Sequence, residues 1–418
     1  MTTNGSSPHD LLLPEGARLL HIGLMKTGTT SLQNAAAVRR KELFERGVLY
    51  PGRSVNHREA MAALMGRTLG GLEPPPRAWK KVRSEIRRDT TRRVLLGHEF
   101  VSEADDAAAQ AIREELGARA HVVITLRNYA AMLPSAWQQT LKTGRTRTFD
   151  SWLRRVLSED PSPRRMRLER DRLDQGAIVK RWAAVFGPEK VTVVVVDKSA
   201  PTLLFDAFED MLGIERGFLA GADLDGFASN RSMSLHETEL LRAINDGLRA
   251  DQLDWLDYRR WMRGGVVGAM LGGRAPGEFD TKLTLPAWAA RRAAKRSARF
   301  VEEIGESGVR VVGDLALLDQ PVPHTDSPDP LPVSVPVDAA AQAVLGAVRQ
   351  ARAERERAEL FRDRLAAKGG PELELADGLR VDEASGRELA TALVKRVGHR
   401  VAGRRSERGA GRREERSQ

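Results

Sequence analysis

The feature that most constrains the fold is the stretch from Arg18 to Asn34, which reads RLLHIGLMKTGTTSLQN. An apolar run over 18–23 leads into a turn over 24–28, and a helical pattern begins at Thr29. A strand, a tight loop and a helix start in this order place unpaired backbone N–H groups and the positive end of a helix dipole beside the loop. Such a helix end binds phosphate-like anions. The stretch therefore predicts an anion-binding loop.

The residue types within this loop suit the same purpose. Gly23 and Gly28 let the backbone approach a ligand closely, and Lys26 adds a mobile positive charge. Four hydroxyl donors follow or flank the Lys, at Thr27, Thr29, Thr30 and Ser31. The loop is not a Walker A motif, which places Lys directly after its second Gly. An ordinary turn with a solvated Lys is the alternative interpretation.

Further apolar strands alternate with helical segments along the chain. Strands of the buried type are predicted at 94–97, 121–126, 191–196 and 309–312. Apolar strands separated by helices indicate a parallel sheet that is covered on both faces. We therefore expect an α/β fold, with three layers: a parallel sheet and helices on either side. Ligands of such sheets bind beyond the carboxyl ends of the strands, where Lys26, His98, Glu99 and Arg127 are expected.

A second motif begins where the strand 121–126 ends. Arg127 follows this strand, and Ser135 lies eight residues later, early in the next predicted helix. A guanidinium fork and a hydroxyl at one strand–helix junction can hold one phosphate group between them. Taken alone, an Arg at a strand end is more often solvated or ion-paired. Together with the first loop, the motif is more specific than either is alone.

The two motifs resemble those of sulfotransferases that use 3′-phosphoadenosine 5′-phosphosulfate (PAPS). Residues 26–31, Lys-Thr-Gly-Thr-Thr-Ser, are similar to the 5′-phosphosulfate loop, and Arg127-Asn128 with Ser135 is similar to the 3′-phosphate motif. The resemblance implies a bacterial, P-loop-like sulfotransferase domain over 17–320, with PAPS as co-substrate and without a metal. It implies cofactor contacts from Lys26, Thr27, Gly28, Thr29, Thr30, Ser31, Arg127 and Ser135. Tyr129 stands where this family usually has Pro.

Sulfuryl transfer also needs a cation at the leaving group and a base for the acceptor. The resemblance implies that Lys26 supplies the cation and that the base is Glu99 or its neighbour His98. We favour Glu99, because Leu-Gly-His-Glu-Phe resembles the pattern of glycan- and protein-modifying members; His98 is the alternative because its ordinary pKa is near neutrality. Neighbours on an extended segment point to opposite faces, so only one is expected to face the acceptor. Both residues could instead only hydrogen-bond the loop backbone.

The acceptor is expected to be a hydroxyl, less often an amine, with carbohydrates and glycolipids among the candidates. Two other function classes stay open. One is a P-loop nucleotide-binding or kinase-like enzyme that uses ATP and magnesium. The other is a basic protein that binds nucleic acid or a membrane.

The C-terminal part differs in composition from the rest. Six prolines between 321 and 336 predict a linker, and residues 337–418 are expected to form a charged helix followed by a basic, disordered tail. Of the net charge of +10, the last 28 residues hold nine Lys or Arg against three Glu. Such a tail suits an anionic membrane or an acidic partner. Without aromatic residues it gives no stacking platform that would indicate specific nucleic-acid binding.

Composition excludes some chemistry and suggests a compartment. The 418 residues contain no Cys, which excludes disulfides, thiolate metal sites and cysteine nucleophiles. The sequence shows neither a secretory signal nor an apolar run of about 18 residues. A cytoplasmic location is the expectation, with the basic tail allowing contact with the inner membrane face.

Overall fold

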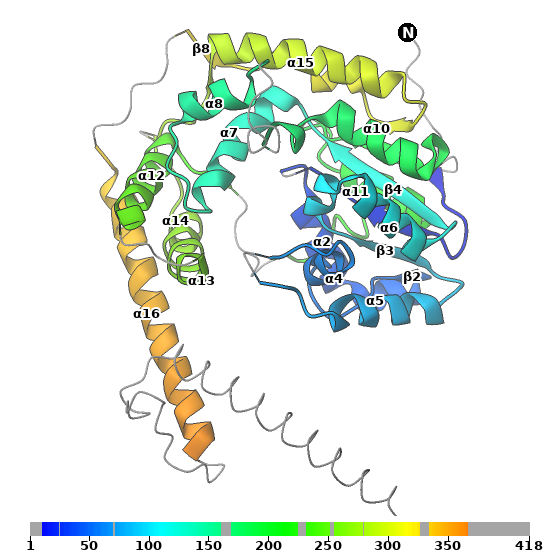
Figure 1. Ribbon diagram of the computed structural model, residues 1–418, viewed down its shortest axis with the longest axis horizontal. Coiled ribbons are helices and arrows are strands. Elements are labelled where there is room, and N and C mark those ends of the chain that lie inside the picture. The colour runs from blue at the N-terminus through cyan, green and yellow to red at the C-terminus, as the bar shows by residue number, and fades with distance from the viewer. Residues whose placement is uncertain are drawn as a thin grey trace, which may run out of the picture.

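A parallel sheet of six strands forms the centre of the molecule, in the order β2-β3-β1-β4-β5-β7 (Figure 1). The computed structural model describes residues 11–24, 26–69, 72–159, 169–224, 231–250, 255–278, 280–326 and 334–366. The strands are β1 Arg18–His21, β2 Val48–Leu49, β3 Arg93–Gly97, β4 Ala120–Leu126, β5 Val191–Val195 and β7 Arg310–Val312. Within the sheet β1 pairs with both β3 and β4, so these three strands lie side by side.

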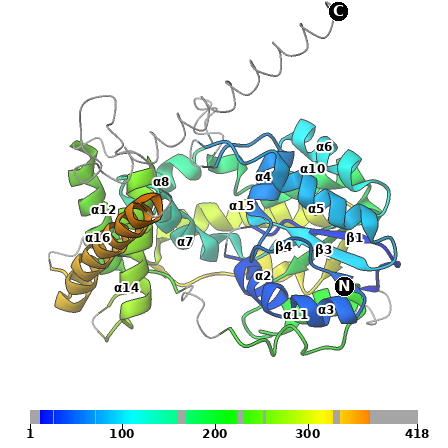
Figure 2. The ribbon, with the colours of Figure 1, turned by 90° about the horizontal axis from the view of Figure 1, so that it is seen from below.

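Helices cover both faces of the sheet, because the side chains of each strand point alternately to one face and the other. Leu20, Leu96 and Val122 pack into one apolar cluster, and Leu19 and Val123 pack into a second. In Figure 2, α2, α3 and α11 lie on one side of the strands, and α4, α5, α6 and α10 lie on the other. The α/β fold with three layers is therefore confirmed.

The helices of the first side are α2 Thr29–Val38, α3 Arg40–Glu45 and α11 Leu203–Leu212. Those of the second side are α4 Arg58–Leu64, α5 Arg77–Arg88, α6 Asp106–Leu116, α7 Tyr129–Leu141, α8 Phe149–Val156, α10 Gln175–Phe186 and α15 Ala287–Gly305. Short 3₁₀ turns are η1 Glu99–Glu103, η2 Pro188–Lys190 and η4 Leu315–Leu318.

The predicted strands lie within one residue of those observed, apart from the first. Strand β1 ends at His21, two residues earlier than predicted. Its backbone hydrogen bonds to β4 nevertheless continue, from Ile22 to Val123 and from Leu24 to Thr125. The chain stays extended up to the loop, which places the loop at the carboxyl end of the sheet.

A helical arm follows residue 234, in a region where the sequence pattern predicts only part of the structure. It comprises α12 Leu235–Ala250, α13 Trp255–Tyr258, the π-helix η3 Arg259–Val267 and α14 Gly268–Gly273. The long helix α16 Val337–Ala366 packs along η3 and α14, and its first turns are held against them (Figure 1). Gly265 and Gly346 let the two backbones meet, since a Cβ on either residue would collide with the carbonyl oxygen of the other.

The start of the proline-rich segment differs from the linker that its composition predicts. Strand β8, His324–Thr325, pairs in parallel with β6, Leu285–Pro286. Proline favours extended backbone, and here the extended segment joins the folded domain instead of leaving it. Residues 327–333 and the basic tail, from 367 onward, lie outside the described residues. Among the described helices, none has the length and hydropathy needed to cross a membrane.

Candidate functional site

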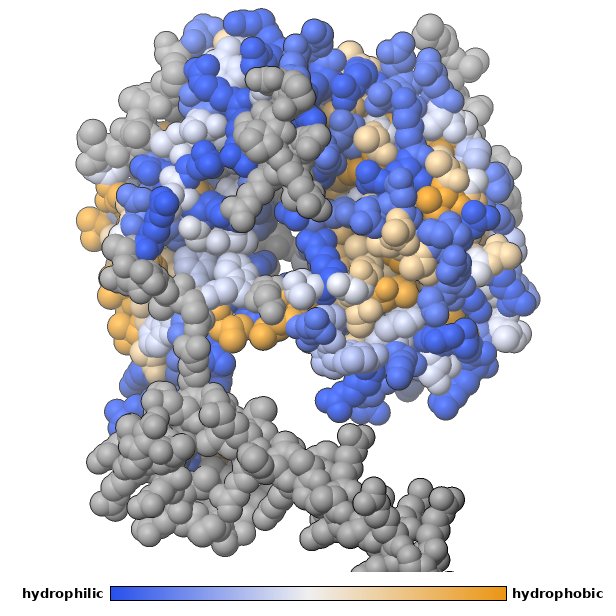
Figure 3. Space-filling view, viewed as in Figure 1, coloured by the Kyte–Doolittle hydropathy of each residue, from blue (hydrophilic) through white to orange (hydrophobic). Residues whose placement is uncertain are grey.

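The loops after β3, β1 and β4 meet at the carboxyl edge of the sheet, because these strands are neighbours. Lys26, His98, Glu99 and Arg127, one or two from each loop, line a single cavity of about 1130 Å³. The polar residues that the strand ends predicted are therefore brought together. In Figure 3, hydrophilic side chains border the hollow between the helical arm and the sheet.

The loop after β1 depends on its two glycines. A Cβ on Gly23 would collide with the side chains of Thr27, Thr29 and Thr125 beneath it. Gly28 has φ +83°, a left-handed conformation that glycine adopts without strain, and it forms the N-cap of α2. The loop thus turns sharply over a tightly packed base.

Thr27 supports this loop from below. Its side chain is fully buried, and its hydroxyl lies 2.6 Å from the carbonyl oxygen of Leu24 and 2.7 Å from the hydroxyl of Thr125. The structure therefore shows the Thr27 hydroxyl engaged within the protein, in contrast to the donor expected from the sequence. Gly28, Thr29, Thr30 and Ser31 do line the cavity.

The N-terminus of α2 is open to an anion. No side chain caps it, and its first turn holds no acidic residue. The amide of Leu32 is bonded to the carbonyl of Gly28 at 3.2 Å. The amides of the three residues before Leu32, at 29–31, have no partner among the described residues, which leaves three donors and the positive end of the dipole for a ligand.

Lys26 lies at the entrance of this helix end in a left-handed conformation, with φ +66°. Burial lowers the pKa of Lys26, and the nearby Arg127 lowers it further. A positive charge that is partly withdrawn from water and repelled by a neighbour is stabilised by an anionic ligand. Burial likewise lowers the pKa of Arg127.

Arg127 connects the two sequence motifs. Its guanidinium donates a hydrogen bond to the main-chain oxygen of Lys26 at 3.1 Å. Its own main-chain oxygen accepts one from the side-chain amide of Gln175 at 2.8 Å. The end of β4 is thus tied to the loop after β1 on one side and to α10 on the other.

The start of α7 is built without the proline of the motif. The side-chain oxygen of Asn128 caps the helix at the amide of Ala131, at 2.9 Å, and its amide group bonds the carbonyl of Gln320 at 2.8 Å. Tyr129 occupies the first helical position and is buried edge-to-face against Phe300, with ring centroids 5.3 Å apart. Tyr129, at the position where the resembled motif has Pro, therefore holds the helix start in place through packing.

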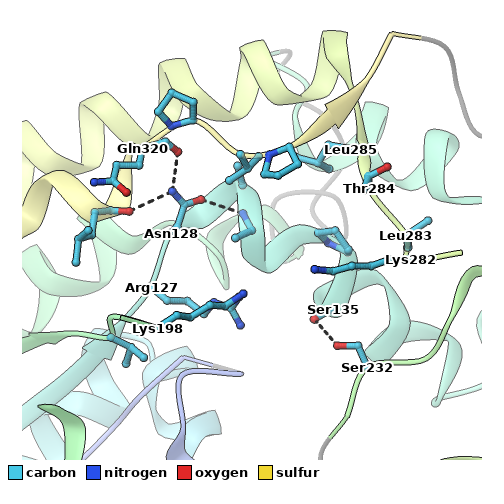
Figure 4. Close-up of a pocket in the computed structure, with 18 of the residues that line it drawn as sticks. Arg127, Asn128, Ser135, Lys198, Ser232, Lys282, Leu283, Thr284, Leu285 and Gln320 are labelled. Carbon is cyan, nitrogen blue, oxygen red and sulfur yellow. Dashed lines mark hydrogen bonds between the residues drawn. The ribbon is translucent and has the colours of Figure 1, made fainter. Parts of the chain in front are cut away.

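A second cavity, of about 560 Å³, adjoins the first. Arg127 and Lys282 enter it from opposite sides, and Lys198 lies beside Arg127 (Figure 4). Arg127 is the main cause that lowers the pKa of Lys198, followed by burial and by Lys282. The hydroxyls of Ser135 and Ser232 meet at 3.3 Å on its floor. Three cations and two hydroxyls thus converge on one space.

Two of these residues were missed by the sequence analysis. Lys198 lies just beyond β5, so the strand-end rule that found Arg127 could also have found it. Lys282 lies in the segment before β6 and reaches the cavity only through tertiary packing, so no local signal marks it. Arg127, Ser135 and Ser232 line both cavities, which makes the two one continuous site.

His98 and Glu99 lie side by side, and this corrects the expectation that only one faces the cavity. The chain turns into η1 at Glu99, so the two residues do not share one extended segment. The Nδ1 atom of His98 accepts the amide of Phe100 at 3.3 Å and lies 3.3 Å from Glu99 Oε2. Burial, with Arg58 and Arg67, lowers the pKa of His98 to about 3, so the ring is neutral near pH 7.

Arg231, just before α12, is bound within the helical arm. Its guanidinium makes a bidentate pair with Glu237 at 2.7 Å to each oxygen. Glu237 is fully buried and also accepts from Arg274 at 2.8 Å. Arg274 in turn pairs with Asp338 at the start of α16, at 2.7 Å. These residues fix the arm to α16.

Within the described part of the chain, no three His, Asp or Glu side chains are grouped so as to hold a metal ion.

The fold and site define an α/β protein with two adjoining pockets, each lined by Lys and Arg, at the carboxyl edge of its sheet. No family model matches the sequence, and no curated protein matches it either. The chain is similar to a solved structure described as a sulfotransferase from Alicyclobacillus acidocaldarius, with 18% identity and a TM-score of 0.37, over 58% of this chain and 98% of the other. Function is therefore inferred from the residues of the site.

Proposed function

We propose that this protein transfers a sulfuryl group from PAPS to an acceptor hydroxyl, which belongs to a carbohydrate, a lipid or another small molecule. One observation carries the proposal: two adjoining cationic pockets share Arg127. The first holds Lys26 and the open amides of α2, and the second holds Arg127, Lys198 and Lys282. A nucleotide with one anionic group at each end of its ribose matches this pair of pockets.

A nucleotide triphosphate explains the site less well. Its anionic charge lies along one chain, which the α2 loop alone would hold. The cations of the second pocket, Arg127, Lys198 and Lys282, would then face only neutral groups. A 3′-phosphate gives these cations a partner, and Ser135 adds a hydroxyl donor to it.

PAPS supplies the sulfuryl group. When the nucleotide leaves as the 3′,5′-bisphosphate, new negative charge appears on its phosphate oxygens. Lys26 and the amides of 29–31 lie where they can stabilise this charge. A bond forms between the acceptor oxygen and sulfur as the bridging bond from sulfur to the phosphate oxygen breaks. The acceptor proton passes to a base at the end of β3.

Glu99 is the better placed base of the two candidates. Its side chain is one-third exposed to the cavity, whereas that of His98 is nearly buried. The Nδ1 atom of His98 lies 3.3 Å both from the amide of Phe100 and from Glu99 Oε2, so this ring nitrogen is engaged within the turn. His98 then holds the turn on which Glu99 lies.

Calorimetry with 3′-phosphoadenosine 5′-phosphate (PAP), AMP and ATP tests the proposal directly. We expect PAP to bind at micromolar affinity without magnesium, and AMP to bind more weakly by about 2–4 kcal/mol, roughly 30- to 900-fold, because it lacks the 3′-phosphate. Arg127→Ala should remove most of this difference. Arg88→Ala, at the exposed end of α5, is the matched control and should leave it unchanged. Equal affinities for PAP and AMP, or tighter binding of ATP with magnesium, would contradict the proposal.

A further inference from the structure

The wall of the large cavity formed by α4 and η3 carries three arginines. Arg58 begins α4, and Arg259 and Arg263 lie on the π-helix; we call these three the arginine wall. Among the described residues, none of the three forms an ion pair. By contrast, the two other arginines of this side, Arg67 and Arg172, both pair with Glu103, at 2.8 and 3.1 Å.

The arginine wall lies beside the expected base. Burial is the main cause that lowers the pKa of Arg58, and repulsion from Arg263 and Arg259 lowers it further. Glu99 and Glu59 act on the same pKa in the opposite direction. Arg259 and Arg263 are thus close enough to repel Arg58, and Glu99 is near enough to attract it.

The pKa of Lys142, at the C-terminal end of α7, is lowered by burial and then by the same excess of positive charge. Burial lowers its pKa to about 8, and Lys26 and then Arg263 are the next causes. Its neighbourhood therefore connects the α2 loop with the arginine wall. Over the whole cavity, seven Lys or Arg face three Glu, so positive charge stays in excess when Lys26 and Arg127 hold a nucleotide.

Both elements that carry the arginine wall are fixed in place. His57, just before Arg58, bonds the carbonyl of Pro51 through Nε2 at 3.0 Å and accepts the amide of Gly97 through Nδ1 at 3.3 Å. This ties the start of α4 to the end of β3. The π-helix is held by its contact with α16, and π-helical turns occur frequently at functional sites.

We propose that the arginine wall binds an anionic group of the acceptor, so that the molecule that receives the sulfuryl group itself carries a sulfate, phosphate or carboxylate. The inference rests on the proposed function for the identity of the second molecule. Guanidinium groups recognise these oxyanions through paired, charge-assisted hydrogen bonds. An anion held there would place a neighbouring hydroxyl of the same molecule near Glu99, between the arginine wall and Lys26.

Inorganic sulfate tests this anion site, because it carries no other recognition feature. Protein saturated with PAP is titrated with sodium sulfate by calorimetry at constant ionic strength, so that the nucleotide pockets are already filled. We expect wild type to bind sulfate and the Arg58→Gln/Arg263→Gln variant to bind it at least tenfold more weakly. Arg260→Gln is the matched control, since Arg260 lies on the same π-helix, is half-exposed and, among the described acidic residues, approaches Glu354 alone, at 3.9 Å. It should bind sulfate as wild type does.

Equal sulfate affinity in the double variant, or no binding by wild type, would overturn the inference. PAP affinity, measured in the same samples, should be the same in all three proteins. If PAP does not bind wild type, that result contradicts the proposed function and leaves the sulfate site to be tested separately. The sulfate affinities of wild type and the variants are then compared without nucleotide. If the double variant does not fold, Arg263→Gln alone, at an exposed position, gives the same comparison with a smaller expected loss, about threefold.

Discussion

The guanidinium of Arg127 donates a hydrogen bond to the main-chain oxygen of Lys26 at 3.1 Å, across 101 residues of sequence. This contact joins the ends of β1 and β4 and makes the two sequence motifs parts of one site. It also means that the conformation of the α2 loop depends on the residue proposed to bind the 3′-phosphate. The two pockets proposed for the nucleotide therefore belong to a single connected unit.

Lys26 should matter more for transfer than for binding. Lys26→Met keeps the length of the side chain and removes its charge, which acts mainly on the charge that develops on the leaving phosphate. We expect the transfer rate to fall by about 10²–10³-fold, while PAP affinity falls much less. Single-turnover kinetics together with PAP calorimetry give the two numbers. Equal fold-losses in transfer rate and in PAP affinity would assign Lys26 to nucleotide binding alone.

Glu99 should be indifferent to nucleotide and essential for transfer. Glu99→Gln preserves shape and removes the base, so we expect unchanged PAP affinity and a transfer rate that is lower by roughly 10²–10⁴-fold. His98→Gln is the companion variant, and it should retain more activity and lose more stability. Full activity in Glu99→Gln together with an inactive but folded His98→Gln would assign the base to His98.

Gly23 should tolerate no side chain. Gly23→Ala places a Cβ among Thr27, Thr29 and Thr125, so we expect a loss of about 1–3 kcal/mol in the free energy of unfolding, with a matching loss of PAP binding. Gly247→Ala is the control, because Gly247 is exposed within α12 and a Cβ there meets open space. It should gain about 0.5–1 kcal/mol. Urea unfolding measures both, and an unaffected Gly23→Ala would show that the loop can relax.

Buried histidines should make the protein sensitive to acid. Burial lowers the pKa of His57 and His121 to about 4. Below about pH 6.5 the unfolded chain binds protons that the folded chain does not, so the free energy of unfolding falls as pH drops from 6.5 toward 4, by about 1.4 kcal/mol per pH unit for each His. Above 6.5 both forms are neutral and the contribution is constant.

His121 offers a test away from the site, since it lies within β4 and contacts the hydroxyl of Thr192 at 2.8 Å. His121→Gln should make the slope of unfolding free energy against pH, between 6 and 5, shallower by up to about 1.4 kcal/mol per pH unit. Urea titrations at several pH values measure this slope. A slope identical to that of wild type would show that His121 titrates in the folded protein as it does in the unfolded chain.

Local pattern was enough to predict the sheet, the loop after β1 and Arg127, because apolar strands and the residues at their ends are adjacent in sequence. The direction of individual side chains was not predictable in this way. Gly97 has φ +141°, a Cβ there would collide with the backbone of His21, and the turn into η1 at Glu99 places His98 and Glu99 on one side. Thr27 looks like its hydroxyl neighbours in sequence, yet only tertiary packing shows that it faces the buried hydroxyl of Thr125.

The arginine wall could not be predicted from the sequence, for a different reason. The run of aromatic and glycine residues over 249–284 matches the periodicity of neither an α-helix nor a strand. A π-helix has a different number of residues per turn, so a search for these two periodicities does not detect it. Its place beside Glu99 further depends on α16, more than 70 residues away in sequence. Contacts of this kind follow from packing rather than from spacing.

The contact between Gly265 and Gly346 shows that two different parts of the structure supply the walls of the site. The pockets proposed for the nucleotide come from the sheet and its loops, whereas Arg259 and Arg263 stand on a helix that is supported by the last described segment of the chain. Substitutions in the arm and in α16 can therefore reshape one wall while the β1 and β4 loops stay as they are. Under the proposed function, such substitutions would change the acceptor while the site for the donor stays the same.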